Sequence, residues 1–300
     1  MEITSVGDNY VAADPTSCLG LIAGDGSLPL EVARGAKASG RNVCAVAYTG
    51  ITDLALQDEV DSATWLHLGE LSALLAVFAD NGVKQAIMAG KVSKQHLYGD
   101  TAALRPDARA LELISQVSDL RDDSILEAIA RVLADDGIEL LPQLKFCPQL
   151  VATPGVLGKA QPTAAHWADI AFAWPIAKAV GGLDLGQSLI VESQAVLAVE
   201  AIEGTDAAIR RGGALGRGGA ALVKVAKPDQ DPRYDVPTIG PATLRTMLDS
   251  NVAVLAFEAS CTIILDREEL MRIADAHGVP VVAIGALGPE PIATTDHKRS

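Results

Sequence analysis

One segment in the last third of the chain concentrates side chains that phosphate chemistry uses. It runs from Lys224 to Gly240 (KVAKPDQDPRYDVPTIG), between an apolar, strand-like run and a helical pattern. Cations such as Lys224 and Lys227 neutralise charge on phosphoryl oxygens, and a carboxylate such as Asp235 holds a metal ion or orients water. Prolines limit the freedom of this segment. It is therefore a candidate phosphoryl-transfer site; the alternative is a solvated loop.

A shorter polar cluster, Glu203-Gly204-Thr205-Asp206, follows another apolar run. Thr205 or Asp206 can cap the helix that we expect next. Asp206 is also a candidate metal ligand together with Asp235, because two carboxylates can share one divalent ion. The residues alone leave both interpretations open.

Other polar residues also have either a structural role or a role in ligand binding. Asp122 and Asp123 precede a helical pattern, so helix capping is their first explanation. Gln187 opens a strand-like run and is either a ligand contact or a turn residue. The histidines share no zinc spacing, and no nucleophile motif built on Ser or Cys is present. Covalent catalysis through Ser or Cys is therefore not expected.

Two glycine-containing turns in the first half offer backbone groups to a ligand. Gly24-Asp25-Gly26 joins an apolar run to a helix with Pro29 at its start, where N–H groups and the positive helix end can hold a phosphate or a ribosyl group. It matches neither the dinucleotide fingerprint nor the P-loop, so a tight turn is an equal alternative. Gly90-Lys91-Val92-Ser93 follows another strand, where Lys91 or Ser93 contacts an anion or is solvated.

Hydrophobic periodicity in the first half predicts strands that alternate with helices. Near-continuous apolar strands in this pattern predict a parallel sheet covered on both faces. The expected strands are 19–23, 42–48, 85–89 and 138–141, and the expected helices are 29–39, 70–79 and 123–134.

A second α/β domain is expected after a segment rich in turn formers. The predicted organisation is an N-terminal extension (1–17), a Rossmann-like domain (18–148), a linker (149–163), a C-terminal catalytic α/β domain (164–288) and a tail (289–300). The C-terminal strands are expected at 188–192, 195–200, 220–225, 252–257, 261–265 and 279–284. Its helices are expected at 164–180, with Pro175 breaking or kinking it, and at 205–211, 242–248 and 266–277.

The charge and the apolar content of the chain limit which macromolecules and membranes it can bind. The formal net charge of −14 over 300 residues excludes a basic nucleic-acid footprint. The first 17 residues lack the basic and apolar regions of a signal peptide, and no apolar run reaches the roughly 18 residues that span a bilayer. We therefore expect a cytoplasmic protein with reduced cysteines. If a membrane is involved, the contact is expected to be peripheral.

The motifs, taken in order, resemble the LpxI family, the UDP-2,3-diacylglucosamine diphosphatases of lipid A biosynthesis. They are GLIAGDGSLP, GKVS, RPDAR, two aspartates before a helix, ATPGVLGK, LDLGQ, VLAVEAIEGTDAAIRR and KVAKPDQDPRYDVPTIG. The resemblance covers roughly residues 18–286, and the last two motifs together are specific.

The resemblance implies Mg²⁺-dependent hydrolysis of UDP-2,3-diacylglucosamine to UMP and 2,3-diacylglucosamine 1-phosphate by a homodimer at the cytoplasmic face of the inner membrane. It implies two domains with the lipid held between them, and it places the catalytic aspartate at Asp235. Metal ligands are then expected among Asp235, Asp206 and Asp123. The expected substrate-binding residues are Gly24, Asp25, Gly26, Lys91, Gln187, Thr205, Lys224, Lys227 and Thr238.

The chain departs from the family pattern at several positions. The family usually has three glycines in place of Gly24-Asp25-Gly26, Asn in place of Lys91, and CEG in place of part of Val191–Gln194. Two rival functions stay open at this point. One is a nucleotide-sugar oxidoreductase, which predicts a dinucleotide fingerprint that this sequence lacks. The other is a non-catalytic lipid or nucleotide-sugar binding protein.

Overall fold

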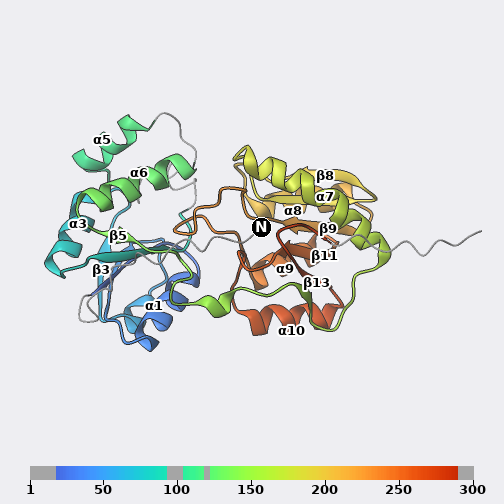
Figure 1. Ribbon diagram of the computed structural model, residues 1–300, viewed down its shortest axis with the longest axis horizontal. Helices are drawn as coiled ribbons and strands as arrows, with labels where there is room; N and C mark the ends of the chain where they lie inside the picture. Colours follow the sequence, from blue (N-terminus) through green and yellow to red (C-terminus); the bar gives the residue numbers. More distant parts are fainter. Residues whose placement is uncertain (1–17, 93–103, 118–121, 290–300) are drawn as a thin grey trace, which may run out of the picture. The chain divides into compact units, whose positions relative to one another are not determined.

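The computed structural model describes residues 18–92, 104–117 and 122–289 (Figure 1). The chain divides into two compact units, Met1–Cys147 and Pro148–Ser300. Each unit has its own sheet and its own core, so the predicted two-domain α/β organisation is confirmed. The segments predicted as an N-terminal extension and a tail lie outside the described residues, apart from Pro289.

The first unit is built on a five-stranded parallel sheet of order β3-β2-β1-β4-β5. The central strand, β1 (Leu19–Ala23), is buried along its whole length, with parallel neighbours at both edges and helices over both faces of the sheet. These neighbours are β2 (Val43–Tyr48) and β4 (Gln85–Ala89), with β3 (Ser62–Leu66) and β5 (Glu139–Leu140) at the edges. The chain therefore switches direction across the sheet between β1 and β4, which is where ligands bind in such folds.

Helices cover both faces of this sheet, with α1 on one side and α5 and α6 on the other (Figure 1). Their bounds are α1 Leu28–Ala38, α2 Leu56–Glu59, α3 Leu71–Asp80, α5 Ala108–Gln116 and α6 Asp122–Asp135. A Cβ atom added at Gly20 would lie 2.8 Å from the ring of the fully buried Phe78, so α3 packs directly on β1.

The second unit has a six-stranded mixed sheet of order β6-β13-β11-β9-β7-β8. Three neighbouring strands run parallel, and β7 runs antiparallel to both β9 and β8. The bounds are β6 Gly155–Leu157, β7 Ser188–Glu192, β8 Ala195–Val199, β9 Ala220–Lys224, β11 Val252–Glu258 and β13 Val281–Ile284. A separate parallel pair joins β10 (Thr238–Ile239) to β12 (Ile263–Ile264).

The segment predicted as a linker, 149–163, contains a strand of the second sheet. A short 3-10 helix, η1 (Pro148–Leu150), precedes β6, which pairs antiparallel with β13. Strand β6 supplies hydrogen bonds to the backbone of β13 on the side that β11 leaves open. Its three residues are too few to give a strand pattern among the surrounding turn formers.

Two hydrophobic layers enclose this second sheet. Helix α7 (Ala164–Gly182) continues through Pro175 and packs Ile170 and Ala173 against strand residues such as Val223. Helices α8 (Thr205–Leu215), α9 (Pro241–Asp249) and α10 (Arg267–His277) pack on the strand residues of the opposite layer, which includes Phe257. Most expected elements of this unit are confirmed within a few residues.

Helix α8 approaches β7 so closely that only glycine fits at one position. A Cβ atom at Gly212 would lie 2.6 Å from Cβ of Ile190, which is fully buried. We expect Gly212→Ala to destabilise the protein by about 1–3 kcal/mol, because the overpacking exceeds the roughly 1 kcal/mol that alanine gains in a helix.

Urea unfolding of Gly212→Ala and Gly182→Ala measures this effect. An added Cβ at Gly182 finds its nearest neighbour at an ordinary 3.6 Å, so this control should be neutral or slightly stabilising. Equal stabilities of the two variants would contradict the packing argument.

Candidate functional site

Polar side chains from three strands meet at one end of the second sheet. Because β7 is antiparallel to β9, Ser188 at the beginning of β7 pairs with Lys224 at the end of β9. The end of β8 lies there too, since the N–H of Glu200 donates to the carbonyl of Ser188 at 2.9 Å. Residues that are far apart in the chain therefore share one edge.

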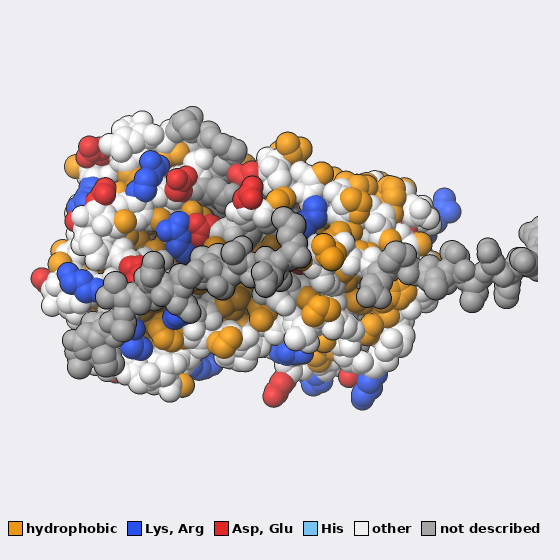
Figure 2. All heavy atoms as spheres, viewed as in Figure 1, with side chains coloured by type: hydrophobic (Ala, Val, Ile, Leu, Met, Phe, Trp, Pro, Cys, Tyr) orange, Lys and Arg blue, Asp and Glu red, His pale blue; other side chains and the backbone are white. Residues whose placement is uncertain are grey.

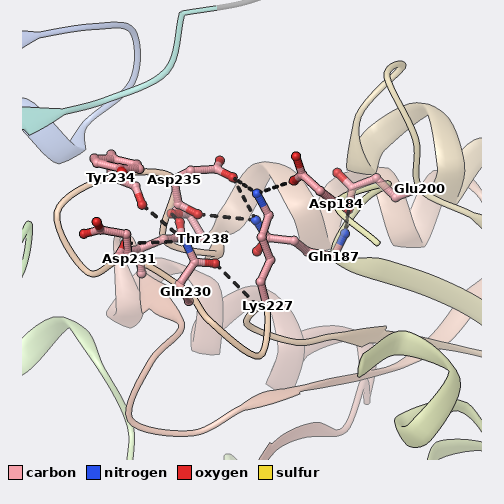
Figure 3. A network of polar contacts seen from close by, with 10 residues as sticks. Asp184, Gln187, Glu200, Lys227, Gln230, Asp231, Tyr234, Asp235 and Thr238 are labelled. Atoms are coloured by element: carbon pink, nitrogen blue, oxygen red, sulfur yellow. Dashed lines mark hydrogen bonds and ion pairs between the residues drawn. The ribbon is translucent and has the colours of Figure 1, made fainter. Parts of the chain in front are cut away.

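Asp235 lies at this edge, and its carboxylate is held by two neighbours (Figure 3). Lys227 Nζ lies 3.0 Å from Asp235 Oδ2, and Gln187 Nε2 donates to the same oxygen at 3.2 Å. The side chain of Lys227 is only 9% exposed, whereas that of Asp235 is 36% exposed. The carboxylate is thus anchored from the protein side and still accessible to solvent.

The backbone at Asp235 adopts the left-handed region, with φ of 51°. Aspartate is one of the few residues other than glycine that enter this region, and such strain concentrates at functional sites. The hydrogen bond from Gln187 Nε2 to the carbonyl of Asp235, 3.3 Å long, helps to fix this conformation.

The loop around Asp235 is braced from within. Gln230 Nε2 donates to the carbonyl of Tyr234 at 3.2 Å, and Tyr234 is buried. Arg233 forms a close pair with Asp231, with Nη2 to Oδ2 at 2.6 Å. Burial alone would raise the pKa of Asp231, but the hydrogen bonds from Arg233 lower it overall. After this loop, β10 joins the backbone to β12 and fixes where the loop ends.

A second polar chain lies beside the first. Lys224 Nζ donates to Thr205 Oγ1 at 2.9 Å, and Thr205 donates to Glu200 Oε1 at 2.7 Å. Burial alone would raise the pKa of Glu200, but the Lys224 ammonium and the hydrogen bonds from Thr205 and the Gln187 backbone lower it overall. The predicted residues Gln187, Thr205, Lys224, Lys227 and Asp235 therefore belong to one connected region.

The other predicted residues of this half take different places. Thr238 donates its hydroxyl to the carbonyl of Val236 at 3.0 Å, close to Asp235 in the chain. Asp206 is exposed in the first turn of α8. The side chain of Asp123 lies outside the described part of α6.

The donor set can be tested against Mg²⁺. Within the described ranges, no three His, Cys, Asp or Glu side chains form a metal-binding group. Magnesium is commonly held by one or two carboxylates together with waters and substrate phosphates. Asp235 meets that requirement, and Asp184, 2.7 Å from the same Lys227 ammonium, can supply a second carboxylate. The predicted magnesium ligands stay a prediction.

The two glycine turns of the first unit form one structure. Asp25 and Lys91 exchange backbone hydrogen bonds of 2.8 and 2.9 Å, which ties the turn after β1 to the turn after β4. A Cβ atom at Gly24 would lie 2.8 Å from the Lys91 carbonyl oxygen, and one at Gly90 would lie 2.7 Å from that of Asp25. Gly26 donates its N–H to the Asp25 carboxylate at 2.8 Å. Gly24, Asp25, Gly26 and Lys91 thus gather at the switch point between β1 and β4, while Ser93 lies outside the described residues.

Sequence reasoning missed two participants, Asp184 and Glu200. Asp184 precedes Gly186-Gln187 in the LDLGQ motif, and Glu200 ends the strand before the EGTD motif. Both belong to motifs in which other residues were predicted as the site residues. An acidic residue at the end of an otherwise apolar strand, as at Glu200, was the available signal.

Comparison with known sequences gives two findings. Family profiles described as the LpxI N-terminal domain and the LpxI C-terminal domain match residues 18–150 and 153–282. The UDP-2,3-diacylglucosamine pyrophosphatase LpxI of Caulobacter vibrioides is 34% identical over 277 residues, which cover 89% of this chain and 97% of that protein.

Solved structures are more distant. The biotin carboxylase domain of a thermophilic 2-oxoglutarate carboxylase aligns with 13% identity and a TM-score of 0.27, over 57% of this chain and 34% of that one. A biotin carboxylase from Campylobacter jejuni aligns with 12% identity and a TM-score of 0.27, over 87% of this chain and 44% of that one. The chain spans less than half the length of these structures, and likenesses this weak carry no argument about function.

The lowered pKa of Glu200 makes the stability of the folded protein depend on pH. Because the pKa of Glu200 is lowered in the folded state, its carboxylate adds stability that is complete above the ordinary value of 4.5. This contribution is lost as the pH falls through the folded-state pKa. Glu200→Gln should therefore lower the urea midpoint at neutral pH and reduce the further fall on acidification below about pH 4.5.

Urea midpoints of wild type, Glu200→Gln and Glu268→Gln, compared between pH 7 and pH 3, measure the effect. Glu268 is exposed on α10 and serves as the control. If Glu200→Gln loses as much stability on acidification as wild type does, Glu200 does not carry the assigned interaction.

Proposed function

This chain belongs to the LpxI family, and on that premise we propose that it hydrolyses the diphosphate of UDP-2,3-diacylglucosamine to UMP and 2,3-diacylglucosamine 1-phosphate. It is then a hydrolase acting on a phosphorus-containing anhydride, in lipid A biosynthesis. The observation that carries the proposal is the 34% identity to the Caulobacter vibrioides pyrophosphatase over 89% of this chain.

Asp235 is the proposed catalytic residue. Its carboxylate is fixed by Lys227 and Gln187 and is the more exposed partner of the ion pair, so it can reach a substrate from a defined position. A preorganised carboxylate loses little freedom when the substrate binds, which lowers the barrier relative to a mobile group.

Lys227 and Lys224 are the proposed cationic groups of the site. Both side chains are more than nine-tenths buried. Charge develops on the phosphate oxygens as the anhydride bond breaks, and fixed cations stabilise it more strongly in a partly buried site than in water. Thr205 and Glu200 hold the Lys224 ammonium in place.

Magnesium is the proposed cofactor, held by Asp235 with Asp184 as the candidate second carboxylate. The bound ion would polarise a phosphoryl oxygen or activate water. Both carboxylates lie within ion-pair distance of the Lys227 ammonium, so they are close to each other, and Asp235, the more exposed of the two, is the primary candidate ligand.

We also propose peripheral contact with the cytoplasmic face of the inner membrane. Leu183 and Leu185 flank Asp184 and are 68% and 55% exposed, and Ile202 near Glu200 is 73% exposed. Figure 2 shows hydrophobic side chains over one face of the second unit. In the described portion, no helix is long and apolar enough to cross a membrane. A homodimer, which the family resemblance implies, is part of the proposal and is tested by sedimentation.

Asp235→Asn tests the catalytic assignment. Asparagine tolerates the left-handed backbone and keeps the shape of the side chain, so the variant removes the charge and exchanges one acceptor oxygen for an NH2 group. We expect turnover of UDP-2,3-diacylglucosamine with Mg²⁺ to fall by about 100-fold or more, because the loss is confined to an interaction used in the reaction.

Release of UMP and of the lipid phosphate is followed by thin-layer chromatography, with circular dichroism as the check on folding. Wild-type rates in a folded Asp235→Asn protein would remove this residue from the mechanism. A folded wild-type protein that binds the substrate without cleaving it would instead support a non-catalytic binding protein.

A further inference from the structure

One ammonium in the second unit is shared by two carboxylates. Lys227 Nζ lies 2.7 Å from Asp184 Oδ1 and 3.0 Å from Asp235 Oδ2 (Figure 3). The two aspartates come from different parts of the fold, one from the end of α7 and the other from the loop after β9. Asp184 has no place in the mechanism so far beyond that of a candidate second ligand.

We propose that Asp184 is a positioning residue that acts through Lys227: it anchors the ammonium, and the anchored ammonium sets the position and the net charge of the Asp235 carboxylate. The proposal rests on the function proposed above and adds a residue to the same site.

Burial and distance assign different parts to the two aspartates. The side chain of Asp184 is 17% exposed and makes the shorter contact, whereas that of Asp235 is 36% exposed and makes the longer one. A buried ammonium needs a partner that stays in place, because an unpaired charge away from water is costly. Asp184 is the fixed partner, and Asp235 is the partner that faces the substrate.

Because Lys227 pairs with both aspartates, it neutralises only part of the negative charge of Asp235. One ammonium between two carboxylates leaves the three groups with a net negative charge. Without Asp184, Lys227 would neutralise Asp235 alone and would move toward it. Asp235 would then be a weaker ligand for a cation and a weaker group for orienting water.

The backbone of Asp184 supports a role that local structure does not explain. Leu183 is the C-cap of α7, and Asp184 follows it with φ of 54°. Glycine is the usual residue at this position after a helix. The N–H of Asp184 donates to the carbonyl of Gly181 at 3.0 Å, a bond that any residue other than proline could make. The contact of the Asp184 side chain with Lys227 therefore explains why an aspartate stands at this position.

Asp184→Asn is the matched test variant, because asparagine accepts the same backbone conformation and keeps the side-chain shape while removing the charge. Asp266→Asn is the control: Asp266 has φ of 44°, is exposed at the N-cap of α10, and its side chain makes no capping hydrogen bond. We expect Asp184→Asn to lower kcat for UDP-2,3-diacylglucosamine by about 10- to 100-fold, the usual effect of removing a group that orients a functional residue. KM should stay within about threefold, and Asp266→Asn should match wild type.

A double-mutant cycle with Lys227→Met separates positioning from a general structural role. If Asp184 acts through Lys227, Asp184→Asn changes kcat in the wild-type background but has little further effect in Lys227→Met. Equal effects in both backgrounds, or a kcat of Asp184→Asn equal to that of Asp266→Asn, would overturn the proposal.

The same cycle on urea midpoints needs no substrate. Asp184→Asn should lower the midpoint in the wild-type background. In Lys227→Met it should leave the midpoint unchanged or raise it, because the two carboxylates then lack the ammonium that they share. Additive shifts would refute the Asp184–Lys227 coupling. Failure of the proposed function gives a different result, an inactive folded wild type, and the urea cycle still decides the coupling in that case.

Discussion

The site depends on a largely buried ammonium whose charge must be balanced by carboxylates of the protein. Lys227 is 9% exposed, and its charge is met by Asp184 and Asp235. A single carboxylate would be neutralised by such a partner, whereas two leave negative charge available at the more exposed one. The left-handed backbone at both aspartates is the conformational cost of bringing them to one point.

The topology of the second sheet makes this meeting possible. Strand β7 is antiparallel to β9, so the beginning of one and the end of the other share an edge, and Gln187 lies beside Lys224 and Lys227. Much of the architecture of both units could be predicted from the sequence, because β1 in the first sheet and β7 and β9 in the second are near-continuous apolar runs. Strands β6 and β10 could not, since three and two residues give no periodicity, and their pairing is decided by distant partners.

The candidate site was predictable where residues of the right chemistry cluster in the chain. Lys224, Lys227 and Asp235 belong to one polar segment, and they do lie in one region. Asp184 was not predictable, because its contact with Lys227 exists only after α7 and the loop after β9 are placed together. Residues that are neighbours in one motif need not face the same site, because consecutive helical residues point about 100° apart. Thr205 faces Glu200, whereas Asp206 faces solvent.

The most direct measurement is a crystal structure of Asp235→Asn with UDP-2,3-diacylglucosamine and Mg²⁺ bound. We predict that the diphosphate lies against residue 235. The Lys227 ammonium should lie within ion-pair distance of a phosphate oxygen or of residue 235 and should still be held by Asp184. A diphosphate bound away from residue 235, with Lys227 and Asp184 remote from every phosphate oxygen, would contradict it.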